Sequence, residues 1–541
     1  MKLSIGNQPV AIPKDAKISL EKSSPFLGND ATSFSYPFPI PRLPNQQAIG
    51  WPGKLERSGE ISNKMFILED QGTQVVAGEI EFDDIDDENI GVILKSGNTE
   101  FWSKIKNLKM ADIDFGSETW LTNPSTFGAF DSKLQEWDAD NNAENAPIIA
   151  VPFWLDNADK SEKVLGNGWQ TVPYSPDIYF AYMRQFRAWY LIEKIFENFD
   201  YTIAADYLKT SEFSQLIVFT KPFYQRVMPS GEDPTICFLD PVGELLIYSS
   251  RMPDMTVQDF LDGIKSIPGI IFLIDDQNKQ VTITLQRSLF EPESIDLMPT
   301  TELKGWIHRE HETTDGYQLT YQSQDDENDT KIDYIINDTV ADTLPTATTE
   351  GRIVHVTSLN RDYITMKKSS DSSLYWSQIG GLKPYIVGNG GLKIEFPVKV
   401  PLTDLYTWPF HPYLAIDITI KRGRSNNEWF LYNDMSDLYI SLFRGYIDSM
   451  GGLLTCAEKW APDATPSLVP VDLFASSHDD YLIWKSTNAR KFTKYIQLDL
   501  PSLMALQWGK RYFIGGIRVV LEKINYDLPW TGIVKVEGYT A

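Results

Sequence analysis

Short apolar runs, each ended by a glycine or by a cluster of polar residues, recur along most of the chain and favour a mainly β architecture. Near the N-terminus, residues 65–68 and 75–82 flank a turn at 69–72 that ends in Gly72. Residues 90–94 and 100–105 flank a polar turn at 95–98. Glycine adopts turn conformations that other residues resist. We therefore predict two hairpins here, and short strands at this spacing are typical of a barrel or a sandwich.

The chain is too long for one hydrophobic core. At 541 residues it should form roughly three to four domains of about 100–200 residues each. The pattern predicts an N-terminal β-barrel-like domain at 1–125, an irregular insertion or long loop at 126–170 and an inserted α/β region at 171–300. A second β domain at 301–400 and a C-terminal β domain at 401–541 follow. The expected fold class is mainly β with inserted α/β units, that is, multidomain α+β.

Two segments of the α/β region are predicted to be helical. Over 177–199 the apolar residues step by three and four, which places them on one helix face; they are Ile178, Tyr182, Phe186, Trp189, Ile192, Phe196 and Phe199. Over 256–267, Thr256 and Asp259 fit a capping pattern ahead of an apolar face. Strands at 270–274 and 281–285 should then form a hairpin. This order resembles that of 177–203, although the identity between the two segments is too low to call a repeat.

Other segments suggest strands or an edge. The proline-rich stretch 35–41 can form neither a helix nor a central strand, because proline lacks the amide donor, so we expect an extended arm or an edge segment. Alternation predicts strands over 414–420 and 496–500. Residues 510–524 should form a strand, a glycine bend and a second strand.

Charge and composition narrow the function classes. A formal net charge of −25 disfavours general nucleic-acid binding, which depends on Lys and Arg contacts to phosphate. Cys237 and Cys456 are too few for a disulfide scaffold or a four-cysteine zinc site and suggest ordinary core thiols. No signal peptide and no membrane-spanning segment is recognisable, so we expect a soluble protein made in a cytoplasm.

Candidate metal ligands are few. His308 and His311 could face one another on a helix, but Trp306-Ile307 and Thr313-Thr314 favour extended structure, so loop histidines are the preferred interpretation. Residues 138–142 begin like a calcium loop, but Ala143 replaces the required glycine and Ile149 the bidentate glutamate. The acidic clusters 83–88 and 325–329 could hold calcium, although acidic surface turns are commoner.

No catalytic motif is present. The glycine-rich run 388–393 departs from the dinucleotide fingerprint, and neither a phosphate loop nor a nucleophile elbow occurs. Paired carboxylates for glycosidase chemistry are always conceivable among 74 acidic residues, so they carry no signal. We therefore assign no catalytic, cofactor-binding or metal residue, expect no cofactor, and expect a non-enzymatic protein.

The 15 tryptophans and 25 tyrosines suit large subunit interfaces or sugar stacking. Core packing is the preferred interpretation for any single one, such as Trp120, Trp154 or Trp408.

The order of several segments resembles hub proteins of phage tails, particularly from phages and prophages of Bacteroidetes-type hosts. The segments that carry the resemblance are 33–38 with Pro44-Asn45 and Gly50, the hairpin with Gly72 and 77–80, 195–201, 256–261, 442–446 and 508–514. Each segment by itself is only a pattern of packing residues. The resemblance rests on the order in which the segments follow one another. The irregular 126–170 segment departs from it.

The resemblance implies tube-like β-barrels with α/β domains between them, assembled as a ring, commonly a trimer. Such a ring would join the tail tube to tip or fibre proteins, let DNA pass without specific binding, and belong to the virion tail after assembly in the host cytoplasm. Two other classes stay open. A carbohydrate-binding or adhesion module would expose Trp and Tyr on one face, and a polysaccharide or peptidoglycan hydrolase would need two carboxylates in a cleft.

Overall fold

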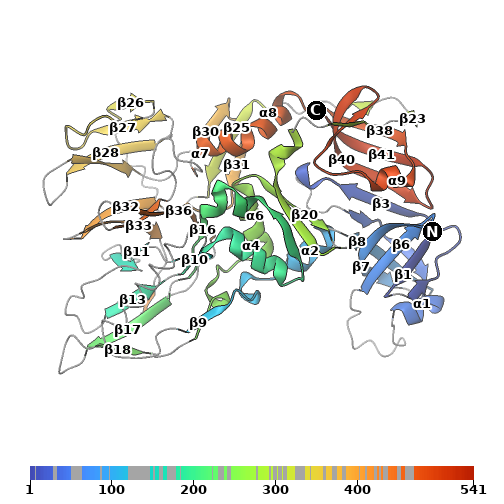
Figure 1. The fold of residues 1–541 in the computed structure, drawn as a ribbon, viewed down its shortest axis with the longest axis horizontal. Helices are drawn as coiled ribbons and strands as arrows, with labels where there is room; N and C mark the ends of the chain where they lie inside the picture. The colour runs from blue at the N-terminus through green and yellow to red at the C-terminus, as the bar shows by residue number, and fades with distance from the viewer. Residues whose placement is uncertain are drawn as a thin grey trace.

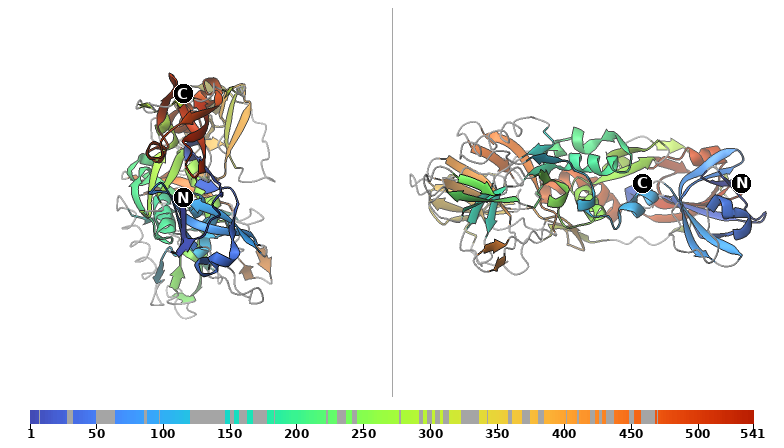
Figure 2. Two further views of the ribbon diagram at one scale, coloured as in Figure 1. Left: turned by 90° about the vertical axis from the view of Figure 1, so that its right-hand side faces the viewer. Right: turned by 90° about the horizontal axis from the view of Figure 1, so that it is seen from below.

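In the computed structural model the molecule is elongated, with β-sheets at both ends and helices α4 (Ala188–Glu197) and α6 (Val257–Ser266) between them (Figures 1 and 2). The structure describes residues 1–541 apart from 7, 28–32, 50–63, 86–87, 97, 120–145, 150–152, 157–162, 167–177, 183, 222, 230–236, 241–244, 276–277, 291–293, 297–300, 303–306, 309–313, 323–335, 342, 358–360, 368–373, 380–384, 401, 409–410, 419–422, 426–427, 431–436, 448–451, 457–467 and 469. The predicted class, mainly β and α+β with several sheets, is confirmed.

One 15-stranded sheet unites the two ends of the chain. Its main path runs β2 (Gln8–Val10), β1 (Lys2–Ile5), β6 (Lys64–Asp70), β7 (Thr73–Ile85), β8 (Asn89–Ser96), β4 (Ser33–Ser35), β3 (Ile18–Ser23), β40 (Ile517–Leu528), β41 (Ile533–Thr540), β38 (Lys491–Gln497) and β23 (Thr301–Glu302). Short strands add to its edges: β5 (Phe38–Pro41), β22 (Ser294–Asp296), β24 (Ile307–His308) and β39 (Arg511–Ile514). The pairings among described residues do not close into a ring, so the expected barrel is not confirmed.

The first predicted hairpin is confirmed and the second is wrong. β6 and β7 pair antiparallel around Gln71 and Gly72, both with positive φ. After β8, however, residues 100–105 belong to helix α2 (Asn98–Ile105). Ile105 lies one turn after Phe101 and Trp102, and all three are buried in the neighbouring core. The helix forms because that spacing buries all three on one face, whereas a strand would divide them between two faces.

The proline-rich stretch is extended, as predicted. Ser35 ends β4 and residues 38–41 form β5, which pairs with β8 on one side only in the described structure. Pro39 and Pro41 therefore sit where a missing amide costs no ladder bond. The short helix α1 (Arg42–Ile49) follows and packs beside β1 and β2.

The helix predicted over 177–199 is wrong in its first half. Residues 178–182 form strand β13 (Ile178–Tyr182), and residues 185–187 form β14 (Gln185–Arg187). Helix α4 (Ala188–Glu197) begins only after them. A step of four is even, so Ile178, Tyr182 and Phe186 share one side of a strand as well as one face of a helix. Within α4 the predicted apolar face is confirmed, since Trp189, Ile192 and Phe196 are buried.

The second predicted helix and its hairpin are confirmed. Helix α6 (Val257–Ser266) begins after Thr256, whose Oγ1 accepts from the Asp259 backbone amide at 3.0 Å and donates to Asp259 Oδ2 at 2.7 Å. Strands β20 (Ile270–Asp275) and β21 (Gln280–Leu285) follow as an antiparallel pair. β15 (Thr202–Asp206), which follows α4, pairs parallel with β21. The two helical units thus share one sheet and one core.

The segment expected to be irregular, 126–170, contains three short strands within its described part. β10 (Ile148–Ile149) joins β14, β16 (Leu216–Val218), β36 (Ile440–Ile447) and β37 (Gly452–Cys456) in one sheet. β11 (Phe153–Asp156) pairs with β12 (Lys163–Gly166) and, in parallel, with β33 (His411–Ile418), which pairs with β32 (Leu402–Trp408). These pairings join strands distant in sequence, which local patterns do not reveal.

The remaining sheets are small. They are β13 with β17 (Phe223–Pro229) and β18 (Cys237–Asp240); β9 (Ser117–Thr119) with β19 (Leu245–Ile247); β25 (Gly316–Tyr321) with β30 (Tyr385–Gly388) and β31 (Leu392–Phe396); β26 (Asp338–Val340) with β27 (Ile353–Val356), β28 (Arg361–Lys367) and β29 (Leu374–Ile379); and β34 (Gly423–Ser425) with β35 (Glu428–Phe430). The glycine-rich run is a turn between β30 and β31. A Cβ on Gly388 would lie 2.4 Å from the Asp315 carbonyl oxygen, so glycine is needed there for space.

The C-terminal region contains helices that the strand patterns did not predict. α7 (Pro470–Leu473), a π-helical turn at Phe474–His478 and α8 (Asp479–Thr487) pack on the sheet, where Trp484 makes an edge contact with Tyr539. The strand predicted over 496–500 ends at Gln497, and helix α9 (Leu500–Met504) follows, capped by Asp499. A short helix α5 (Tyr207–Thr210) completes the elements discussed below. The predicted strand, glycine bend and strand at 510–524 are confirmed by β39 and β40.

The domain boundaries stay a prediction. Nevertheless, β3 pairs with β40 along its whole length, and one core contains Leu20 and Tyr526 together. The N-terminal and C-terminal segments therefore fold onto each other, and the α/β unit lies between them in sequence.

Candidate functional site

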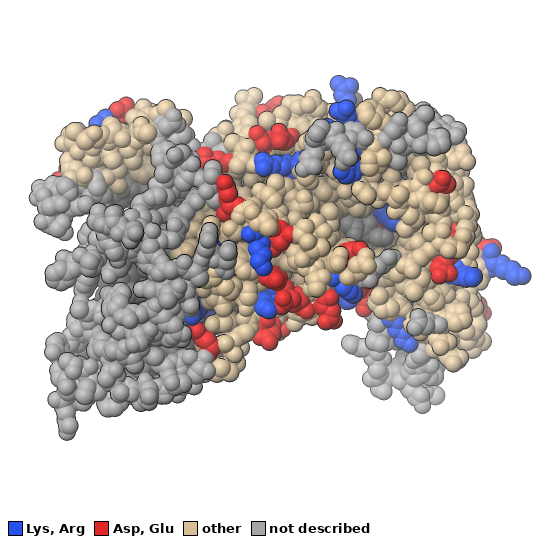
Figure 3. All heavy atoms as spheres, viewed as in Figure 1, with Lys and Arg blue, Asp and Glu red and all other residues tan. Residues whose placement is uncertain are grey.

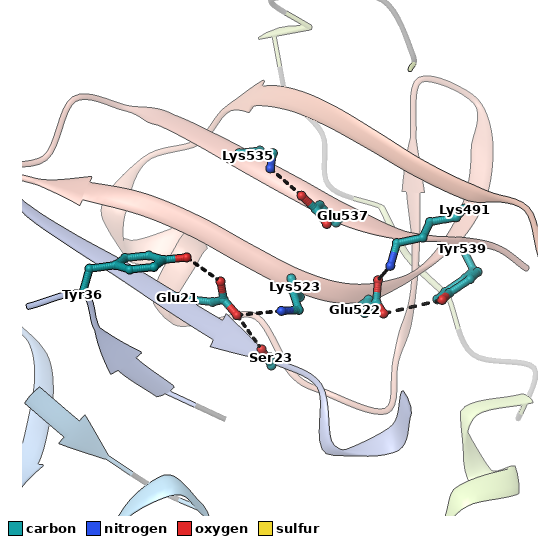
Figure 4. Close-up of polar contacts among 9 residues, drawn as sticks. All are labelled: Glu21, Ser23, Tyr36, Lys491, Glu522, Lys523, Lys535, Glu537 and Tyr539. Atoms are coloured by element: carbon teal, nitrogen blue, oxygen red, sulfur yellow. Dashed lines mark hydrogen bonds and ion pairs between the residues drawn. The ribbon is translucent and has the colours of Figure 1, made fainter. Parts of the chain in front are cut away.

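A row of charged and polar side chains crosses the outer face of strands β3, β40, β41 and β38 (Figure 4). The inner face of the same strands is apolar and contains Ile18, Leu20, Ile524, Val534 and Val536. The row joins residues more than 450 positions apart in sequence, at the place where the two ends of the chain meet. Its residues are Glu21, Ser23, Tyr36, Lys491, Glu522, Lys523, Lys535, Glu537 and Tyr539.

A β-bulge in β40 brings two adjacent charges onto this face. Leu521 pairs with Gly538 and Lys523 pairs with Glu537, so Glu522 is the extra residue. Consecutive strand residues normally point to opposite faces, and a bulge breaks that alternation. Leu521 and Ile524 both lie in the inner core, which leaves Glu522 and Lys523 together on the outer face. A single inserted position thus places an acid and a base side by side.

The first cluster is centred on Glu21. Its Oε1 accepts from Lys523 Nζ at 2.9 Å and from Ser23 Oγ at 3.3 Å, and its Oε2 accepts from the Tyr36 hydroxyl at 3.0 Å. Hydrogen bonding to Glu21 raises the pKa of Tyr36 and, against an opposing effect of burial, that of Lys523. Both groups therefore keep their protons at neutral pH and act as donors.

The second cluster has the same composition. Glu522 pairs with Lys491 Nζ at 2.6 Å and accepts from the Tyr539 hydroxyl at 3.5 Å. Burial opposes the charge on Lys491, but the bond to Glu522 raises its pKa overall. Between the clusters, Lys535 pairs with Glu537 on β41. Each carboxylate is thus matched by one ammonium group.

The acids lie beneath the bases. The side chains of Glu21, Glu522 and Glu537 are 8%, 11% and 12% exposed. Their lysine partners are 34%, 27% and 35% exposed. A carboxylate at such depth needs its partners, because an unpaired buried charge is costly. The printed contacts join β3 to β40 through Glu21 and Lys523, and β40 to β38 through Glu522 and Lys491, so the row acts as a clamp between strands.

We expect the Glu21–Lys523 pair to show a coupling of about 1 kcal/mol between Glu21→Ala and Lys523→Ala in a double-mutant cycle of unfolding free energies, because Glu21 is buried. The more exposed Lys17–Asp527 pair, 65% and 35% exposed, is the matched control and should couple by only a few tenths of a kcal/mol. Equal coupling in both pairs would mean that burial does not strengthen the clamp.

The candidate metal ligands are not brought together. His308 lies in strand β24, opposite Phe492, so the backbone is extended there as its flanking residues predicted. His311, residues 138–142 and the acidic cluster 325–329 lie outside the described residues. In the cluster 83–88, Asp83 and Glu88 are exposed. Among the described residues, no group of three or more His, Cys, Asp or Glu is placed to hold a metal ion.

Asp206 is the one carboxyl group with a raised pKa among the described residues. Burial raises the pKa of Asp206, the property expected of a general acid. Asp206, however, caps helix α5, since its Oδ1 accepts from the Lys209 backbone amide at 3.0 Å. Its position is explained by the helix end, and it gives no support to a hydrolase. The absence of catalytic residues stays a prediction.

Sequence patterns missed the polar row. The signal was present as the adjacent polar pair Glu522-Lys523 inside an otherwise apolar run, which interrupts strict alternation and is typical of a bulge. The sequence around Glu522-Lys523 does not show which strands lie beside β40. Among the described residues, no helix is long and apolar enough to cross a membrane.

Comparison with known proteins gives little further information. No protein-family model matches the chain, and no curated protein matches it. One solved structure that it resembles is the 43 kDa tail protein of prophage MuSo2 from Shewanella oneidensis, at 9% sequence identity over 100% of this chain and 97% of that chain, with a TM-score of 0.35. At that TM-score the two chains need not share a fold, so nothing about this chain is taken from the similarity.

Proposed function

We propose that the chain is a non-enzymatic structural component of a phage tail, a hub-like subunit that forms a ring between the tail tube and the tip or fibre proteins. The ring is a trimer of identical chains around the DNA channel, assembled in the host cytoplasm and carried in the virion. The proposal starts from the order of segments that resembles tail hub proteins, spread from residue 33 to residue 514.

The observation that carries the proposal is the joining of both chain ends in one sheet. β3 pairs with β40, while the α/β unit built on α4 and α6 lies between them in sequence. The resemblance implies α/β domains between tube-like β-barrels, and an α/β unit that lies in sequence between β segments is consistent with that order. The clamp of buried carboxylates and lysines fits a framework that must hold its shape.

The surface is consistent with a DNA channel that does not bind DNA. On the face drawn in Figure 3, the lysine and arginine side chains of the described residues lie among acidic ones and form no continuous basic stripe. With a net charge of −25, the contacts that neutralise phosphate are too few for general affinity.

The two alternative functions lack support in the described part of the chain. A sugar-binding face needs exposed aromatic rings, but among the described residues Tyr36 is the one aromatic side chain among the exposed large hydrophobics. Trp189 is buried, and Lys209 Nζ covers its ring at 4.3 Å from the centroid. A hydrolase would need paired acids in a cleft, and the buried carboxylates described above are each paired with a lysine.

Mass photometry across a salt series tests the proposal. The protein should form closed oligomers of three chains, and added salt should favour them, because screening beyond about 8 Å weakens repulsion between acidic subunits while apolar contacts persist. Negative-stain images should show rings, and a DNA gel shift should stay negative at every salt concentration. A monomer under all conditions, with no ring after mixing with tail-tube or tip proteins, would contradict the proposal.

A further inference from the structure

Strand β3 directs one lysine side chain, that of Lys22, toward the apolar inner face of the sheet. Glu21 and Ser23 point outward into the polar row, so Lys22 points inward with Ile18 and Leu20. β3 is paired on both sides, by β4 and β40. An inward charge on an edge strand can block unwanted strand pairing, but that explanation does not apply to an internal strand.

The Lys22 amine has no acidic partner in the described part of the chain. Its recorded contacts are Met504 Sδ at 3.9 Å and the Tyr526 ring, whose centroid is 5.9 Å away. The side chain is half-buried. Burial lowers the pKa of Lys22 to about 8, so the group is still largely charged at neutral pH. A positive charge among apolar groups is costly unless an anion accompanies it.

A second donor without an acceptor lies beside it. Tyr526 is 3% exposed, and its hydroxyl has no hydrogen-bond partner among the described residues. Leu20 pairs with Tyr526 and Lys22 with Ile524, so Lys22 and Tyr526 are diagonal neighbours on the same face of adjacent strands. A buried hydroxyl normally finds an acceptor. Two donors of different types therefore lie on the same face of adjacent strands, and no oxygen of the described residues is recorded as accepting from either.

We propose that Lys22 and Tyr526 form a socket for a carboxylate group, in which one carboxylate oxygen accepts from the Lys22 amine and the other from the Tyr526 hydroxyl. A carboxylate matches this pair in charge and in number of acceptor atoms, whereas a phosphate would leave further oxygens without donors. The carboxylate belongs either to a small free acid or to an Asp or Glu of a second copy of this acidic chain. The socket does not depend on the proposed tail function.

Competitive labelling of the amines tests the socket in the wild-type protein, with acetate as the probe and chloride at equal ionic strength as the reference. The neutral amine is the reactive form, so an unoccupied Lys22 should be labelled readily at about pH 8. Bound acetate that returns the amine to the ordinary lysine pKa near 10.4 should slow labelling on the order of 100-fold at that pH. Lys17, which is exposed and paired with Asp527, is the internal control and should not change.

Thermal unfolding provides a second readout. Acetate should raise the melting temperature of the wild type above its value in chloride, and Lys22→Met and Tyr526→Phe should each reduce that increase. In dilute protein, the same increase in Lys22→Met as in the wild type, or Lys22 labelling that acetate does not slow, would overturn the socket. The labelling result stands even if a variant fails to fold.

A dilution series without acetate distinguishes the two sources. If a second copy supplies the carboxylate, Lys22 labelling should rise as the protein is diluted, and acetate should slow it again in the dilute sample. If the acid is a free molecule, labelling should be the same at all protein concentrations and should fall only on addition of acetate. Labelling that responds to neither dilution nor acetate contradicts the proposal.

Discussion

Replacing Trp189 with alanine should lower the free energy of unfolding by about 3–5 kcal/mol, the usual cost of removing a large aromatic side chain from a close-packed core. Trp189 is 7% exposed in the core of the α/β unit. Its ring makes an edge contact with Tyr190 at 6.1 Å between centroids, and Lys209 covers it from the solvent side. Alanine would remove these contacts and leave a cavity between α4 and its surroundings.

Chemical denaturation followed by circular dichroism measures this loss. Trp189→Phe is the matched variant, since it keeps an aromatic ring and should lose less than the alanine variant. Leu43→Ala, at a side chain that is 75% exposed, is the control and should change stability by less than about 0.5 kcal/mol. An unchanged stability of Trp189→Ala would show that the ring is not a core residue and would favour the ligand-binding alternative.

Replacing Arg187 with alanine should be comparably destabilising, by about 3–5 kcal/mol. Arg187 is 2% exposed and connects three segments. Its Nε donates to the Ala146 carbonyl at 3.2 Å, and its Nη1 donates to the Ser214 carbonyl at 3.0 Å and to Gln215 Oε1 at 2.6 Å. The guanidinium carbon also lies 5.1 Å from the centroid of the Phe443 ring. Alanine would leave these buried acceptors without a donor, and each unsatisfied acceptor lowers the free energy of unfolding.

Arg187→Lys separates the two properties of arginine. Lysine keeps the charge but not the planar fork that reaches several acceptors at once, so the lysine variant should lose most of the same stability. Burial lowers the pKa of Arg187 to about 10, and the group stays protonated near neutrality. The loss should therefore be equal at about pH 6 and about pH 8. Wild-type stability in Arg187→Lys would show that the charge alone holds the segments.

Local patterns predicted the elements whose contacts are close in sequence. The hairpin at 64–85 needs one turn with Gly72, and helix 257–266 needs its cap from Thr256 and Asp259, so both could be identified before the structure. The proline-rich edge followed from the missing amides alone. In each case the deciding interaction lies within a few residues of the pattern, and no distant segment competes with it.

The errors occur where two structures satisfy one pattern. Ile178 and Tyr182 are four residues apart, which puts them on one side of a helix and of a strand alike. The strand forms because β17 lies beside it. At residues 100–105 the predicted strand is instead a helix. Helix α2 forms there because it buries Phe101, Trp102 and Ile105 in a core that the N-terminal segment shares with the α/β unit.

By itself the sequence determined the class of the fold, because period, glycine, proline and capping residues act locally and bias each segment whatever surrounds it. It also fixed the net charge and with it the expectation of weak affinity for nucleic acid. Only the tertiary structure decided that β3 pairs with β40, that a bulge turns Glu522 and Lys523 to one face, and that Lys22 faces inward beside Tyr526. These features depend on pairings between residues about 500 positions apart, and the entropy of closing such a loop is repaid only by contacts that no local pattern contains.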